Sequence, residues 1–398
     1  MKRYYKLIII ALMGMVCFLG ATCGSTGSTA GTFSIDNFVL GGEHYQSPHA
    51  LAAPETFRNI TASQLVSEIK VGWNLGNSLD AHPGGETSWG NPRTTQENID
   101  TIKNAGFNAI RIPVSWTKNL NSSNIIRANW MDRVTEVVNY AVANDMYIIL
   151  NTHHDEDAFK FVYNQRASSL TTFHAVWTQI AYNFRNYNEK LIFEGLNEPR
   201  TKDSQSEWSG GTSPEHDIVN EYYQLFVNIV RASGGNNDKR IIMVNTYAAS
   251  AEQRAMEGLV IPNDTIANKI IVSIHAYTPY NFALNQGGGS TDKWSRDNPH
   301  DTSAIRVVFD RAENMFISEG YPVIMGEFGS VHRNNEAARA DWVEYYVSYA
   351  RSKGVPCFLW DNGAVSGSGE KFGFLNRRNN TFPFPDYLEA LMKGAGVR

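Results

Sequence analysis

The chain reads Leu191-Ile192-Phe193-Glu194-Gly195-Leu196-Asn197-Glu198-Pro199, an apolar run that ends in Asn-Glu-Pro. A second apolar run, Pro322-Val323-Ile324-Met325-Gly326-Glu327-Phe328-Gly329, ends in Gly-Glu-Phe-Gly. Continuous apolar runs of this length are typical of parallel strands that are covered on both faces. A glutamate is costly to bury unless it is paired or used in chemistry. The two runs therefore predict buried parallel strands, each followed closely by a carboxylate.

Eight short apolar runs can be counted along the chain, and helical patterns separate most of them. The runs cover residues 71–75, 108–112, 146–150, 191–194, 240–244, 270–274, 322–325 and 356–360. Helical patterns cover residues 95–104, 130–144, 170–188, 217–233, 303–319, 336–353 and 386–393, with a weaker one at 251–258. Eight βα units in series predict an α/β fold closed into a (β/α)8 TIM barrel. An open doubly wound sheet is the alternative, but residues 72–77 lack the Gly-rich phosphate turn that usually follows its first strand.

Polar and aromatic side chains recur at the carboxyl ends of these expected strands, where a barrel carries its active site. In chain order they are Asn77, Arg111, His153, His154, Asn197, Glu198, His275, Tyr277, Glu327 and Trp360. Two carboxylates that face one cavity are the equipment for cutting a glycosidic bond. Convergence at so many strand ends is stronger evidence for an active site than any single motif.

A role follows for each of these side chains. Glu327 is the expected nucleophile, and a guanidinium such as Arg111 would keep it ionised. Glu198 is the expected general acid, with a pKa raised by burial and by the anionic Glu327, and it later serves as the base that activates water. Asn197 is expected to bind the sugar hydroxyl next to the reacting carbon, and Tyr277 to donate to the nucleophile or stabilise charge at the ring oxygen.

The remaining candidates are expected to hold the sugar. His153, His154 and His275 would orient the ring and the two carboxylates. Trp360 offers a flat apolar face for stacking a pyranose. Trp208, on the loop that follows the fourth strand, is the best candidate for a further aromatic subsite, on loop position alone.

Structural interpretations stand beside these functional ones. The Asn-Glu-Pro turn could be a helix start, Arg111 an ion-pair partner, and Trp360 a core residue. Glu194 is expected inside the barrel, paired with a side chain such as Arg111. The run His153-His154-Asp155 invites a zinc interpretation, but adjacent strand residues point to opposite faces, and no Cys pair or third His is near in sequence. We therefore expect neither a metal nor a cofactor. Asp155, Glu156 and Asp361 are expected on loops and are weaker candidates.

Composition and the N-terminus limit the class of protein. The formal net charge of −5 and the absence of basic runs longer than two residues after the N-terminus argue against a nucleic-acid partner.

Residues 1–23 have the basic start and short apolar segment of a secretory signal, so we expect a secreted or outer-surface protein. A lipid on Cys23 and ordinary cleavage nearby are the two alternatives. Residues 24–56 are expected to be a flexible linker, and residues 57–398 a single catalytic domain. Cys357 is expected to be a buried small hydrophobe.

The chain resembles glycoside hydrolase family 5. The matching motifs are Ile110-Arg111-Ile112-Pro113, Asn151-Thr152-His153-His154, Leu196-Asn197-Glu198-Pro199, His275-Ala276-Tyr277, Ile324-Met325-Gly326-Glu327-Phe328-Gly329 and Phe358-Leu359-Trp360-Asp361-Asn362. Residues 72–81, 89–92 and 360–363 further resemble subfamily 4, which includes xyloglucan-active endoglucanases. The resemblance implies a retaining endo-β-1,4-glucanase with Glu198 as acid/base and Glu327 as nucleophile. It also implies that the other strand-end residues line the subsite beside the cleaved bond.

The expected substrate is a cellulose-like, mixed-linkage or xyloglucan chain, cleaved at internal β-1,4-glucosidic bonds by a monomeric enzyme. Three alternatives remain. An endo-β-1,4-mannanase would use the same carboxylate pair, and a non-catalytic surface glycan-binding protein would not need both glutamates. A metal-dependent hydrolase ranks last, because the chain shows no zinc-ligand spacing.

Overall fold

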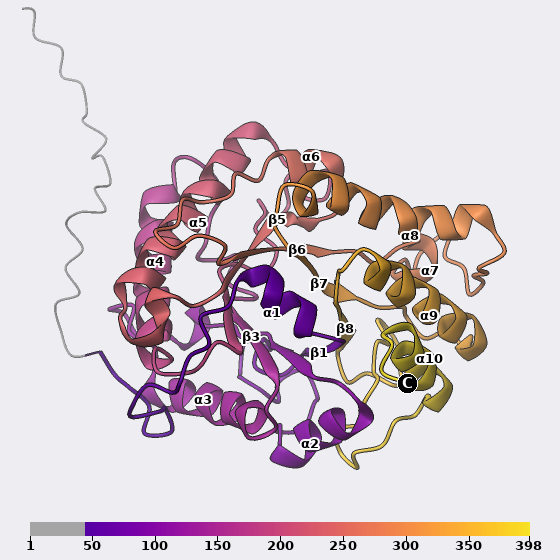
Figure 1. Cartoon of the computed structure of the whole chain (residues 1–398), viewed down its shortest axis with the longest axis horizontal. Coiled ribbons are helices and arrows are strands. Elements are labelled where there is room, and N and C mark those ends of the chain that lie inside the picture. The colour runs from indigo at the N-terminus through magenta and orange to yellow at the C-terminus, as the bar shows by residue number, and fades with distance from the viewer. Residues whose placement is uncertain (1–43) are drawn as a thin grey trace, which may run out of the picture. The chain divides into compact units, whose positions relative to one another are not determined.

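The computed structural model describes residues 44–398, and these contain a closed barrel of eight parallel strands (Figure 1). The strands are β1 (Gly72–Leu75), β2 (Ala109–Ile112), β3 (Tyr147–Asn151), β4 (Leu191–Glu194), β5 (Ile242–Ser250), β6 (Ile270–His275), β7 (Val323–Phe328) and β8 (Cys357–Asp361). They pair in chain order, and β1 closes the ring by pairing with β8. The (β/α)8 barrel expected from the sequence is therefore confirmed. The expected signal segment lies outside the described residues.

Helices surround the barrel (Figure 1). They are α2 (Gln96–Ala105), α3 (Ala128–Ala143), α4 (Arg166–Asn183), α5 (Ser213–Ala232), α6 (Gln253–Glu257), α7 (Tyr280–Ala283), α8 (Pro299–Ala312), α9 (Glu336–Ser352) and α10 (Pro385–Gly394). Helical periodicity placed the longer ones within about five residues of these bounds. The expected helix at 303–319 is α8 followed by a π-helical turn, Glu313–Ile317.

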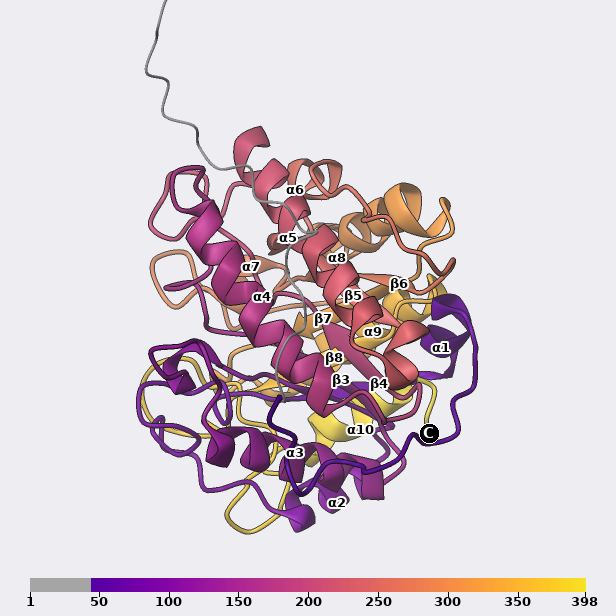
Figure 2. The ribbon, with the colours of Figure 1, turned by 90° about the vertical axis from the view of Figure 1, so that its left-hand side faces the viewer.

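One helix that the sequence analysis missed closes the amino-terminal end of the barrel. Helix α1 (Ala62–Glu68) lies across the middle of the ring of strands in Figure 1 and at one end of it in the side view of Figure 2. Thr61 begins α1 with a capping box, because its hydroxyl accepts from the amide of Gln64 and the Gln64 side chain accepts from the amide of Thr61. Leu65 and Val66 of α1 pack in one apolar cluster with barrel residues such as Ile149. This apolar cluster fills the amino-terminal end of the barrel interior, and we call it the floor of the barrel.

Part of the segment expected to be a flexible linker is packed on the barrel. The amide of Ser47 donates to Asn183 Oδ1 at 2.8 Å, and the amide of Glu55 donates to the carbonyl of Asn186 at 2.8 Å. Ser47 is 3% exposed. Residues 44–56 therefore belong to the folded domain, which begins earlier than position 57. Asn183 and Asn186 lie more than 120 positions later in the chain than the residues they bind, so local composition could not reveal these contacts.

The interior of the barrel changes character along its axis. At the floor the strands contribute apolar side chains, among them Ile192, Met243, Ile271 and Phe358. Cys357 is fully buried in β8, as expected for a small apolar residue. Polar side chains take over toward the carboxyl ends of the strands, where Arg111 and Glu194 are both fully buried. The chemistry of the protein therefore lies at the end opposite α1.

None of the helices between residues 44 and 398 combines the length and apolar character needed to span a membrane.

Gly72 offers a test of how tightly the floor of the barrel is packed. A Cβ at Gly72 would lie 2.1 Å from Cδ1 of Phe358, inside van der Waals contact. Gly72→Ala should therefore reduce the free energy of unfolding by about 1–3 kcal/mol, the usual cost of overpacking a core. Equilibrium urea unfolding measures the change. Gly288→Ala is the matched control, because a Cβ there meets nothing within 4 Å. Equal stability of the two variants would contradict this account of the packing.

Candidate active site

The buried guanidinium of Arg111 connects several strands at the carboxyl end of the barrel. Arg111, in β2, donates from Nε to Glu194 at 2.7 Å and from Nη1 to Glu327 at 2.6 Å. It also donates to the side-chain oxygens of Asn74 at 3.0 Å and Asn197 at 2.7 Å. Burial alone would lower the pKa of Arg111, but the two carboxylates outweigh it and hold the pKa above its usual value. The expected pairing of Glu194 with Arg111 is confirmed, and Arg111 also contacts Glu327 as predicted.

Glu327 is held from two sides near the end of β7. Its Oε1 accepts from Arg111, and its Oε2 accepts from the Tyr277 hydroxyl at 3.0 Å. Burial, followed by the charge of Glu327, raises the pKa of Tyr277 well above its usual value. Tyr277 therefore stays a neutral donor to this carboxylate. These two donors fix the orientation of the Glu327 carboxylate, as a nucleophile requires.

Glu198 lies across from Glu327, just after β4. Its Oε1 is 3.0 Å from Nδ1 of His275, and that nitrogen is 3.8 Å from Oε2 of Glu327. One oxygen of each glutamate and a ring nitrogen of His275 lie within 4.8 Å of one another. The structure thus brings both carboxylates into one site, as the sequence predicts.

Burial is the main cause that raises the pKa of Glu198 above its usual value, and the Arg200 guanidinium opposes it. The carboxylate of Glu156 raises this pKa further. The predicted direction and the part played by burial are confirmed, but the anionic neighbour among the largest causes is Glu156 rather than the predicted Glu327. Burial lowers the pKa of His275 to about 4, so this imidazole is neutral near pH 7.

His153 and His154 do not point to opposite faces. Strand β3 ends at Asn151, so both histidines follow the strand, and their ring centroids are 4.5 Å apart. His82 stacks on His154 at 5.8 Å, so a third histidine is near in space although far in sequence. The alternation argument fails here because it holds only within a strand.

The other predicted side chains occupy different positions around the same opening. Trp360 is 9% exposed and stacks on His153 with centroids 5.7 Å apart, so much of this indole is packed rather than free. Asn77 follows β1 with a left-handed backbone (φ 54°) that is held by Asp80. Trp208 is 61% exposed and lies over the guanidinium of Arg200 at 4.5 Å.

Two carboxylates considered weak candidates are structural. Asp361 is the last residue of β8 rather than a loop residue, and it accepts from the indole of Trp73 and from the amides of Gly363, Phe374 and Leu375. Asp155 accepts from the amides of Trp116 and Thr117, and burial raises its pKa to about 6. Both residues order loops around the opening.

Two clusters in the described part of the chain have ligating atoms close enough for a metal ion, but a carboxylate in each cluster already accepts several hydrogen bonds. The first is Asp80, His153 and His154, and the second is Glu198, His275 and Glu327. Asp80 accepts from backbone amides, and Glu327 accepts from a guanidinium and a phenol. These bonds suit an organic substrate site, and the expectation of no metal stays a prediction.

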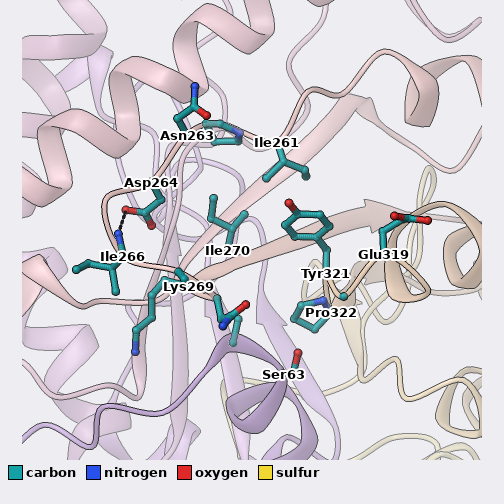
Figure 3. A pocket seen from close by; sticks show the side chains of 15 residues that line it. Ser63, Ile261, Asn263, Asp264, Ile266, Lys269, Ile270, Glu319, Tyr321 and Pro322 are labelled. Carbon is teal, nitrogen blue, oxygen red and sulfur yellow. Dashed lines mark hydrogen bonds between the residues drawn. The ribbon is translucent and has the colours of Figure 1, made fainter.

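Two side chains that contact the carboxylates border open space. A hollow of about 420 Å³ is lined by His275 and Tyr277 together with residues of α8. A separate hollow of about 360 Å³ lies between α1 and the loops that precede β6 and β7 (Figure 3). Its lining includes Asp264, Lys269 and Tyr321, and it contains none of the predicted site residues. The candidate active site is therefore the opening at the carboxyl ends of the strands.

Comparisons with known proteins agree with this geometry. The model of the family "Cellulase (glycosyl hydrolase family 5)" matches residues 75–366. The chain is 43% identical over 345 residues to "Endoglucanase A" of Clostridium longisporum, covering 84% of this chain and 66% of that protein. It therefore spans just under two thirds of that relative's length.

Solved structures share the fold at similar identity. A "GH5-4 broad specificity endoglucanase from Ruminococcus champanellensis with bound cellotriose" is 46% identical, with a TM-score of 0.82, covering 85% of this chain and 100% of that one. A glycoside hydrolase 5 lichenase from Caldicellulosiruptor sp. F32, in complex with cellotetraose, is 39% identical, with a TM-score of 0.81, covering 88% of this chain and 99% of that one.

Arg111→Gln tests the organising role of the guanidinium. Removing the charge leaves Glu194 and Glu327 buried without their cation, and breaking a buried pair typically costs about 3–5 kcal/mol. We expect a loss of unfolding free energy in that range, measured by urea unfolding. Arg93→Gln is the control, because the Arg93–Glu136 pair is exposed and should contribute less than about 1 kcal/mol. Similar losses in the two variants would contradict the assignment.

Proposed function

This chain belongs to glycosyl hydrolase family 5, and we propose that it is a retaining endo-β-1,4-glucanase in which Glu327 is the nucleophile and Glu198 the acid/base. The observation that supports the proposal most is the facing pair of carboxylates. Their nearest oxygens lie within 4.8 Å. A retaining enzyme separates its carboxyl groups by about 5–5.5 Å, whereas an inverting one leaves about 6.5–9.5 Å for a water molecule.

The reaction would proceed in two displacements. Glu327, oriented by Arg111 and Tyr277, attacks the anomeric carbon while Glu198 protonates the departing glycosidic oxygen. A covalent glycosyl-enzyme forms and the leaving chain departs. Glu198, now a carboxylate, takes a proton from water, and the water oxygen attacks the same carbon and displaces the Glu327 carboxylate, which breaks the glycosyl-enzyme bond. Configuration is retained because the anomeric centre is inverted twice.

The neighbouring side chains would bind and orient the sugar. Asn197 is fixed by Arg111 through its side-chain oxygen, so its amide NH2 remains to donate to the hydroxyl beside the reacting carbon. His153, His154, Asn77 and the exposed edge of Trp360 would contact the sugar on one side of the scissile bond. Trp208 would offer a platform farther along the chain, because its indole is largely exposed.

The proposed substrates are cellulose-like, mixed-linkage and xyloglucan chains. The relatives described above bind cellotriose or cellotetraose, or are named for activity on β-glucans. We further propose that the protein acts as a monomer outside the cell, either freely secreted or anchored through a lipid on Cys23. A mannanase or a non-catalytic glycan binder remains the alternative for the experiments below to decide.

Two amide variants test the assigned roles. Glu327→Gln should abolish turnover, because an amide cannot form the glycosyl-enzyme. Glu198→Gln should reduce kcat on cellotetraose by about 10²–10⁴-fold, the usual contribution of a general acid/base. Glycosylation by dinitrophenyl cellobioside should suffer much less in Glu198→Gln, because this leaving group needs no proton. Stopped-flow burst kinetics follow that step. Near-normal turnover of cellotetraose by either variant would overturn the assignment.

Substrate class and stereochemistry can be read from the products. We expect reducing ends to be released from mixed-linkage glucan, carboxymethyl cellulose and xyloglucan faster than from mannan. Proton NMR of the first product formed from cellotetraose should show the β anomer. A preference for mannan would favour the mannanase, and no release from any polymer would favour the glycan binder.

A further inference from the structure

Arg200 follows the Asn-Glu-Pro turn directly and contacts Glu198 at two points. Its Nη1 donates to the backbone carbonyl of Glu198 at 3.0 Å and lies 3.5 Å from Oε2 of the same residue. The opposite oxygen, Oε1, faces His275 at 3.0 Å. Glu198 is therefore held from both sides, and Arg200 holds the oxygen that His275 does not.

The same guanidinium binds two more carboxylates. Nη1 donates to Glu156 at 3.2 Å, and Nε donates to Glu207 at 3.0 Å. Glu207 in turn accepts from the amide of Asp203 at 2.8 Å, which closes the turn between Arg200 and Glu207. Arg200 is only 11% exposed at its side chain. One largely buried cation thus contacts three carboxylates, and only one of them, Glu198, has a proposed part in the reaction.

The fourth residue that Arg200 contacts is aromatic. The guanidinium lies 4.5 Å below the ring of Trp208, whose other face is open because the residue is 61% exposed. A guanidinium under an indole is a favourable cation–π arrangement. A sugar that stacks on Trp208 would therefore rest on a platform whose underside is the cation that contacts Glu198.

Charged and titratable groups face Glu198 from several elements. They are Arg111 in β2, His154 and Glu156 after β3, Arg200 after β4, His275 at the end of β6, Tyr277 after it, and Glu327 in β7. Among these, Arg200 favours the anionic form of Glu198, whereas Glu156 opposes it. Arg200 lowers the pKa of Glu198 and Glu156 raises it, although the two side chains are hydrogen-bonded to each other.

We propose that Arg200 is a positioning residue that orients the Glu198 carboxyl, joins it to the Trp208 platform and, together with Glu156, decides which carboxyl of this cluster carries the proton. The inference rests on the proposed function, in which Glu198 is the acid/base. Burial and the Glu156 carboxylate favour the protonated form of Glu198, whereas His154 and Arg200 favour the anionic form of Glu156. When Glu198 gives its proton to the leaving oxygen, Arg200 is already in place to stabilise the new carboxylate, so no charged group has to move into position during the step.

The pH dependence of kcat/KM on cellotetraose tests the proposal, because it reports the ionisation of the free enzyme. Arg200→Gln removes the stabilising cation, so Glu198 should hold its proton to higher pH. The alkaline limb should then move up by about one pH unit or more. Glu156→Gln removes the opposing anion, so the same limb should move to lower pH. A merely structural role for the cluster would not move the limb in opposite directions.

Two control variants separate charge from shape. Arg200→Lys keeps the cation but loses the planar contact with Trp208, so the limb should stay near its wild-type position. Trp208→Ala removes the ring without a charge change, so KM for cellotetraose should rise while the limb stays in place. Circular dichroism and urea unfolding show whether each variant is folded, and Glu156→Gln decides the matter if Arg200→Gln does not fold.

The outcomes distinguish this proposal from the function on which it rests. If Glu198→Gln is inactive on cellotetraose but neither Arg200→Gln nor Glu156→Gln moves the limb, the positioning role is wrong and the acid/base assignment stands. Shifts of both variants in the same direction would also overturn it. If Glu198→Gln turns over cellotetraose normally, the proposed function itself fails.

Discussion

The site depends on the buried guanidinium of Arg111. In a low-dielectric interior two carboxylates near each other would repel and take up protons, and neither would be a dependable nucleophile. Arg111 donates to Glu194 and Glu327 through separate nitrogens and still reaches Asn74 and Asn197. Strands β1, β2, β4 and β7 are thereby connected at one level of the barrel. Closure of the barrel brings these four strands together. The guanidinium then fixes the side chains at their carboxyl ends relative to one another.

Environment gives the two facing glutamates different chemistry. Glu327 receives hydrogen bonds from a permanent cation and from a phenol that stays neutral. Glu198 meets an imidazole that is neutral near pH 7, one shared guanidinium and an additional anion, Glu156. Two donors accordingly orient the Glu327 carboxylate, whereas burial favours the protonated form of Glu198. Identical side chains at two strand ends can thus perform opposite tasks.

The barrel and the glutamate pair could be predicted from the sequence because both depend on local patterns. Apolar runs mark buried parallel strands, and a polar residue after each run lies where the strands converge. The features that could not be predicted depend on contacts between residues that are distant in sequence. The capping box of α1 is a visible local signal, but its packing under the strands is not, and residues 44–56 are ordered by side chains such as Asn183. Arg200 stands beside Glu198 in sequence, yet its role becomes visible only with Glu156 and Trp208 placed around it.

The apolar floor beneath α1 has a consequence for how such proteins change over generations. It lies at the opposite end of the barrel from the polar layer and shares none of its side chains. Mutations that reshape the rim can accumulate without eroding the part of the interior that resists unfolding. Substitutions in the loops alone can therefore change which polysaccharide is bound, while the contribution of the apolar floor to the free energy of unfolding stays the same.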